Sequence, residues 1–208
     1  MKKNIPHIVI EFPDYFPENY EDFFVNGIEN KFLDLRIERK EPTVWAASEW
    51  IIPGIVAVYI LKPYFEAFLK EAGKDHYSLL KNKIKDILAK TKSMDVKTLT
   101  ASESTKKINN SNSQSKAISI FIQTENGVLI KLLYDNNLDL KTWQNSTINF
   151  LQHIEEHYEN SINNPLSEYL NKQESKTIYA IIDPETKDWI LINNLGQYER
   201  EKREKENL

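Results

Sequence analysis

The chain has 208 residues, of which 40% are hydrophobic and 11% are aromatic, which supplies enough apolar material for a folded core. It contains no cysteine, and this excludes disulfides, thiolate metal ligands and cysteine nucleophiles. Its formal charge of −4 gives no general attraction to nucleic acid or to anionic lipid, so neither a specific nucleic acid nor a membrane is the expected partner.

The first predicted elements are a strand, a helix and a second strand. Residues 8–12 form a short β-branched strand, where a signal peptide would need a longer apolar stretch. Together with the missing cysteines, this favours a cytoplasmic protein. Apolar residues at four-residue intervals predict a helix over 19–32, and strict alternation predicts a strand over 33–38.

The longest apolar stretch runs over residues 50–69. It predicts a buried helix that begins near Pro53 and is bent or broken at Pro63, because proline removes a helical hydrogen bond. The part without polar side chains is about a dozen residues long, whereas a bilayer crossing needs roughly twenty. A membrane-associated protein is therefore an alternative that this stretch leaves open.

A second helix is predicted after Gly73, with one apolar face and one solvated basic face that includes Lys81, Lys83, Lys85 and Lys90. The segment 102–116 is rich in Ser and Asn and has little to bury, which is typical of a flexible linker or loop. We place a boundary there between two halves of the chain, 1–101 and 117–197.

The second half contains two predicted hairpins around a long helix. The first hairpin carries Asn126 and Gly127, the pair that a type I′ turn prefers, and Asp139 is the expected cap of the helix. The predicted strands cover 117–123, 128–134, 177–182 and 189–192, and the helices cover 139–160 and 165–172. Residues 198–208 form a charged tail.

These elements predict an α+β protein. In its C-terminal half an antiparallel sheet of two hairpins packs on the long helix, and its N-terminal half is a helix-rich mixture.

One motif carries the residues of a zinc site. His153, Glu156 and His157 match the H-x-x-E-H pattern and so resemble the inverted zinc peptidases over five residues. On a helix, two histidines four residues apart present nitrogens to one Zn²⁺ while the glutamate activates a bound water. The resemblance implies a zinc peptidase; the competing interpretation is a polar helix flank.

A second motif resembles the PD-(D/E)xK nucleases. Pro13 and Asp14 are followed by Glu38, Arg39 and Lys40 at the end of a predicted strand. The resemblance implies that Asp14 and Glu38 hold Mg²⁺ and that Lys40 stabilises either the attacking hydroxide or the charge of the phosphorane. Glu38 and Lys40 are equally well explained as residues on the solvent-exposed face of a strand in which polar and apolar residues alternate.

The remaining feature is a concentration of aromatic residues in and before the long apolar stretch. Such residues anchor protein interfaces when they are exposed and form plain core when they are not. The candidates are Trp45, Trp50, Tyr59, Tyr64, Phe65 and Phe68. The sequence has no glycine-rich phosphate loop and no serine-hydrolase elbow. We therefore expect a non-catalytic protein without a cofactor that binds another protein or itself, with a metal-dependent hydrolase as the alternative.

Overall fold

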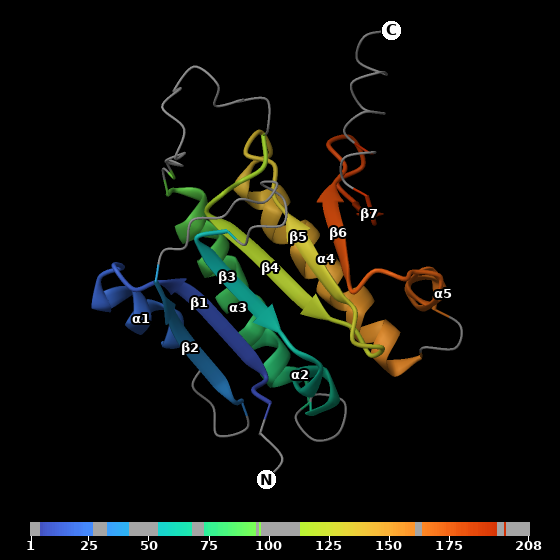
Figure 1. The fold of residues 1–208 in the computed structure, drawn as a ribbon, viewed down its shortest axis with the longest axis horizontal. Coiled ribbons are helices and arrows are strands. Elements are labelled where there is room, and N and C mark those ends of the chain that lie inside the picture. The colour runs from blue at the N-terminus through green and yellow to red at the C-terminus, as the bar shows by residue number, and fades with distance from the viewer. Residues whose placement is uncertain are drawn as a thin grey trace, which may run out of the picture.

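Seven described strands form one mixed sheet in the computed structural model (Figure 1). The structure describes residues 5–26, 33–41, 54–67, 73–94, 96, 113–160, 164–194 and 198, with the side chains of 67 and 73–76 left out. In sheet order the strands are β2 (Leu35–Lys40), β1 (Ile8–Pro13), β3 (Val56–Ile60), β4 (Ile118–Gln123), β5 (Leu129–Leu133), β6 (Thr177–Ile182) and β7 (Trp189–Ile192).

Parallel and antiparallel pairs alternate across this sheet. The pairs β1–β2, β3–β4 and β5–β6 are parallel, and the pairs β1–β3, β4–β5 and β6–β7 are antiparallel. The protein is therefore of the α/β class, and the prediction of a purely antiparallel sheet in an α+β protein was wrong. Both predicted hairpins exist, but β5 and β6 join them in parallel, and β3 pairs with β4 across residues 61–117.

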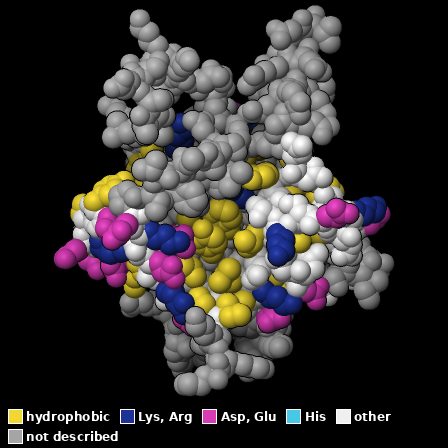
Figure 2. All heavy atoms as spheres, viewed as in Figure 1, with side chains coloured by type: hydrophobic (Ala, Val, Ile, Leu, Met, Phe, Trp, Pro, Cys, Tyr) yellow, Lys and Arg dark blue, Asp and Glu magenta, His cyan; other side chains and the backbone are white. Residues whose placement is uncertain are grey.

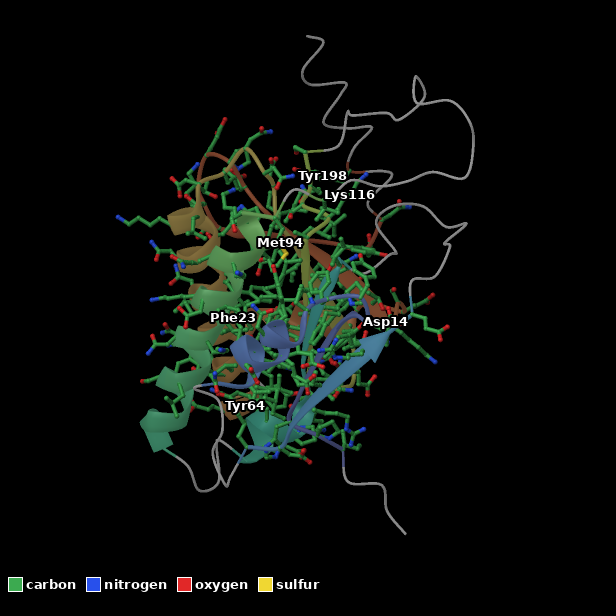
Figure 3. All side chains as sticks on the ribbon, turned by 90° about the vertical axis from the view of Figure 1, so that its left-hand side faces the viewer. Asp14, Phe23, Tyr64, Met94, Lys116 and Tyr198 are labelled. Carbon is green, nitrogen blue, oxygen red and sulfur yellow. The ribbon has the colours of Figure 1, made fainter. Side chains whose placement is uncertain are left out.

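The main hydrophobic core lies between one face of the sheet and the helices. The described helices are α1 (Glu18–Val25), α2 (Lys62–Ala67), α3 (Gly73–Lys92), α4 (Leu140–Glu159) and α5 (Pro165–Asn171). A view along the edge of the sheet shows α3 and α4 on the same side of it (Figure 3). The opposite side, which we call the helix-free face, carries none of the helices α1 to α5; the helical residue Tyr198 packs there against Leu133, Ile181 and Ile192.

The connections through α3 and α4 explain why these two helices lie on the same face of the sheet. Strands β3 and β4 run antiparallel to strands β5 and β6. In both parallel pairs the second strand lies on the side of the first that is nearer to β7. Since α3 and α4 lie on the same face, the two crossovers have opposite hands, and one of them departs from the right-handed rule. Two right-handed crossovers would have placed these helices on opposite faces.

The helix predicted for the long apolar stretch was also wrong within the described residues. Residues 56–60 form strand β3, and α2 begins only at Lys62, so that Pro63 lies in a first helical turn, where proline is tolerated. The strand lies between β1 and β4, and most of its residues are buried. Its sequence is therefore an unbroken apolar run, which periodicity cannot distinguish from a buried helix. No described helix is long and apolar enough to span a membrane.

Several other predictions are confirmed. The strands β1, β6 and β7 and the helices α4 and α5 lie where the patterns indicate, whereas β2 begins and ends two residues later than the predicted 33–38. Asp139 caps α4 by accepting a hydrogen bond of 2.6 Å from the Thr142 N–H. The turn of the first hairpin differs from type I′: Gly127 has a φ of 85° and Asn126 is not left-handed. This is a three-residue loop in which glycine takes the left-handed position.

Lys83 was expected on a solvated face of α3, but it is only 5% exposed. Its Nζ donates hydrogen bonds to the carbonyls of Phe23 and Asn26 at the C-terminal end of α1. These carbonyls have no partner within their own helix, and the helix dipole favours a cation beside them. Lys83 thereby ties α1 to α3, and α1 ends at Val25; the rest of the predicted helix, 27–32, lies outside the described residues.

The predicted linker lies mostly outside the described residues, which resume at Ser113. From there Gln114 bridges Asp135, and the Ser113 hydroxyl donates to the Asp135 carboxylate at 2.7 Å. The boundary between two halves stays a prediction, as does the charged tail, of which only Tyr198 is described.

Candidate functional site

A continuous row of side chains crosses the helix-free face. Each side chain in the row lies directly opposite the next one, which belongs to the neighbouring strand, because the register of the strand pairs aligns them. The row consists of Arg36, Val9, Tyr59, Phe121, Lys131, Tyr179 and Ile192. It begins with a cation, passes through aromatic residues and ends on an aliphatic side chain.

The centre of the row is an aromatic pair. The rings of Tyr59 and Phe121 stack with centroids 4.6 Å apart and planes 9° apart. Lys131 lies beside them, with its Nζ 5.6 Å from the Phe121 ring centroid, and it is only 2% exposed. Burial lowers the pKa of Lys131 to about 8. Hydrophobic side chains are visible near the middle of this face in Figure 2.

The β1–β2 end of the face is polar. Lys40 forms an ion pair with Glu11 at 2.5 Å, and Glu11 lies opposite Glu38 on the neighbouring strand. The Tyr59 hydroxyl is a hydrogen-bond partner of Glu11, and burial, with the nearby carboxylates, raises the pKa of Tyr59. Tyr59 therefore stays protonated, and its hydroxyl donates a hydrogen bond to the Glu11 carboxylate. This network holds the aromatic ring in place from its polar end.

The β6–β7 end is apolar. Leu133, Ile181 and Ile192 form a separate buried cluster on this face, and Tyr179, Ile190 and Tyr198 pack against it. The helix-free face therefore changes from charged to aromatic to aliphatic along the sheet. Val9, Phe121, Ile181 and Ile192 are buried on this face, and Arg36 is exposed. Its half-buried apolar side chains are Tyr59, Tyr179 and Ile190.

The nuclease-like residues are only partly brought together. Glu38 and Lys40 lie on the helix-free face of β2, but Asp14 lies in the turn after β1, beyond the end of the paired strands (Figure 3). The Asp14 N–H donates to the Lys40 carbonyl at 3.0 Å, and the Asp14 carbonyl accepts from Arg39. Lys40 is engaged by Glu11 instead.

The zinc-like residues have separate roles. His153 and Glu156 form an exposed pair at 3.4 Å, whereas His157 is buried at 3% exposure. Its Nε2 accepts from the Glu125 N–H at 3.4 Å, so its Nδ1 carries the proton and donates to the Ser167 hydroxyl at 2.6 Å. Both ring nitrogens are thus engaged. Over the described part of the chain, no three His, Asp or Glu side chains are grouped so that they could hold a metal ion.

The aromatic interaction candidates are divided between core and surface. Tyr64 and Phe65 are 3% and 1% exposed and belong to the main core, where they cannot meet a partner in this fold. Tyr59 is half-buried on the helix-free face. Trp45, Trp50 and Phe68 lie outside the described residues.

Sequence reasoning missed Phe121 and Lys131 as members of this face. Strand β4 is buried on both sides, so its apolar run does not reveal which residues face the helices. The signal that could have found the face is Lys131, a single charge inside an otherwise apolar strand. A lysine at such a position marks the side of the sheet that lacks the main core.

A second titratable cluster lies at the junction of α2, α3 and α4. Burial raises the pKa of Glu155 to about 7, although the Tyr77 hydroxyl and the Lys81 ammonium favour its charged form. The Lys81 Nζ lies 3.5 Å from the Tyr77 ring centroid. Burial and the nearby Glu155 charge together raise the pKa of Tyr64. Glu155 therefore makes the stability of this junction depend on pH.

We expect Glu155→Gln to remove that dependence. The folded chain binds this proton more tightly than the unfolded chain, so stability is highest below the ordinary value of 4.5 and falls as pH rises to about 7. The variant should be about 1–2 kcal/mol more stable than wild type at pH 8 and similar at pH 4.5. Urea unfolding at both pH values measures this, with the exposed Glu156→Gln as control. A variant that follows the wild-type pH profile would contradict the assignment.

The geometry on the helix-free face is suited to binding. It offers a stacked aromatic pair, an apolar end and an ion pair between Lys40 and Glu11. Comparison of the chain with protein-family models, with curated proteins and with solved structures found no match.

Proposed function

We propose that this chain is a non-catalytic protein that binds another protein through the helix-free face of its sheet. The observation that carries the proposal is the Tyr59–Phe121 pair on the helix-free face, stacked with ring centroids 4.6 Å apart. Tyr59 is half-buried and is the ring that a partner would meet, while Phe121 is 7% exposed and supports it from β4. Aromatic side chains held rigid by their neighbours lose little conformational entropy on binding, and they dominate the energy of many interfaces.

The composition of the rest of the face supports the same proposal. The paired Glu11 and Lys40 supply a polar margin that hydrogen-bonds without leaving an unpaired charge when water is excluded. At the apolar end the half-buried Tyr179 and Ile190 supply contact area. The partner expected from this chemistry is a protein with an apolar patch, bordered by polar groups at the end that meets β1 and β2.

A change at Tyr59 tests the proposal. Tyr59→Thr removes the ring but keeps a β-branched residue suited to a strand. Tyr15→Thr is the matched control, since Tyr15 is 62% exposed in the turn between β1 and α1. Wild type and both variants, each shown to be folded by circular dichroism, serve as baits in extract of the cells that make the protein.

The expected result is a partner recovered in stoichiometric amount by wild type and by Tyr15→Thr, and at least about tenfold less by Tyr59→Thr. The same recovery with all three baits would show that the aromatic pair is not the binding surface.

A further inference from the structure

The outer edge of β7 differs from the opposite edge of the sheet. β7 consists of Trp189, Ile190, Leu191 and Ile192, without a charge or a proline. The edge strand β2 carries Arg36, Glu38, Arg39 and Lys40. Charged side chains are a common device by which edge strands resist pairing with other chains. The edge strand β2 carries such charges, and the four residues of β7 carry none.

The outer side of β7 is also unpaired within the described structure. β7 is the last strand in the sheet order, and none of the backbone hydrogen bonds of the described residues joins it to a strand other than β6. Three of its four residues, all except Ile192, are only half-buried. Strand addition satisfies such backbone groups and covers such side chains together.

We propose that β7 pairs antiparallel with β7 of a second copy of this chain, so that the two sheets continue into one. The pairing does not depend on Tyr59 and is separate from the proposed function. A second β7 suits this edge because neither strand brings a charge that would have to be desolvated or would repel a like charge.

Symmetry fixes how the two copies would face each other. An antiparallel twofold pair has its axis perpendicular to the sheet and is centred on a residue, here Ile190 or Leu191. Trp189 and Leu191 lie on the helix side, and Ile190 and Ile192 lie on the helix-free face. Both helix layers would therefore lie on one side, and the two helix-free faces would form one surface with the aliphatic clusters at its middle.

The absence of cysteine makes the pairing directly testable. A cysteine placed at the centre of an antiparallel twofold pair faces its own copy with Cα atoms about 4.5–5.5 Å apart, within the range of a disulfide. Ile190→Cys and Leu191→Cys cover the two registers. Arg36→Cys, on the charged edge strand β2, is the matched control.

Each purified variant is oxidised mildly, and the mass of the wild-type chain is measured by light scattering. We expect twice the 24.4 kDa chain mass. We also expect one of the two β7 variants to form a disulfide-linked dimer at least about tenfold faster than Arg36→Cys. A wild-type chain that stays monomeric, or β7 variants that crosslink no faster than Arg36→Cys, would overturn the proposal. Neither outcome would alter the result expected for Tyr59→Thr.

Discussion

Gly54→Ala is expected to destabilise the protein by about 2–3 kcal/mol, because the added Cβ has no room. It would lie 2.5 Å from the carbonyl carbon of Ile118 and 2.8 Å from the Cα of the same residue. These are backbone atoms of a central strand and cannot move aside. Gly54 also donates a hydrogen bond of 2.7 Å to the Ser119 hydroxyl, immediately before β3 pairs with β4.

The measurement is urea unfolding followed by circular dichroism. Gly127→Ala is the matched control: its Cβ would meet nothing within 4 Å, but its φ of 85° is left-handed. That substitution should cost only about 1 kcal/mol. If Gly54→Ala unfolds at the wild-type urea concentration, the close approach of residue 54 to β4 is incorrect.

Trp143→Ala is expected to cost about 4 kcal/mol, since Trp143 is fully buried and anchors the start of α4. Its Nε1–H donates to the Asp135 carbonyl at 2.8 Å, and its ring lies 4.9 Å from that of Tyr134. The Lys92 Nζ lies 4.0 Å from the ring centroid. One side chain thus joins the end of β5, the end of α3 and the beginning of α4.

Trp143→Phe separates the contribution of ring packing from that of the hydrogen bond to the Asp135 carbonyl. Phenylalanine keeps an aromatic ring in the core but cannot donate to Asp135, so we expect a smaller loss of about 1–2 kcal/mol. Thermal and urea unfolding should rank the chains as wild type, then Trp143→Phe, then Trp143→Ala. A loss below about 1 kcal/mol for Trp143→Ala would mean that α4 is not held on the helix side in this way.

Local signals were enough to predict most elements of the second half. Asp139 at the start of α4, Gly127 in the first hairpin and Asp183 in the second act on neighbouring residues. Asp183 accepts hydrogen bonds from the N–H groups of Glu185 and Thr186, which closes its turn. The positions of these elements therefore followed from the sequence.

Pairings between distant strands could not be predicted in the same way. The sequence contains no local feature that tells whether β5 pairs with β6 in parallel, because the choice depends on where α4 packs. The same holds for β3, whose residues Val56, Val58 and Ile60 suit a buried helix as well as a strand. Lys83 was misjudged because its partners, the carbonyls at the end of α1, are about sixty residues away.

The candidate site depends on those distant pairings. Tyr59 could be singled out from the sequence as an aromatic residue in an apolar stretch. Its contacts with Phe121 and Glu11 exist only because β3 lies between β4 and β1. The sequence therefore indicated one residue of the face but not the surface around it.

The most direct test of the helix-free face as a binding surface is hydroxyl-radical footprinting of its tyrosines. Oxidation of Tyr59 and Tyr15 is compared in the purified protein and in the same protein within extract of its own cells. If the face is occupied by a partner, Tyr59 becomes protected in the extract while Tyr15 is oxidised as before. Equal oxidation of Tyr59 in both conditions would contradict the proposed function.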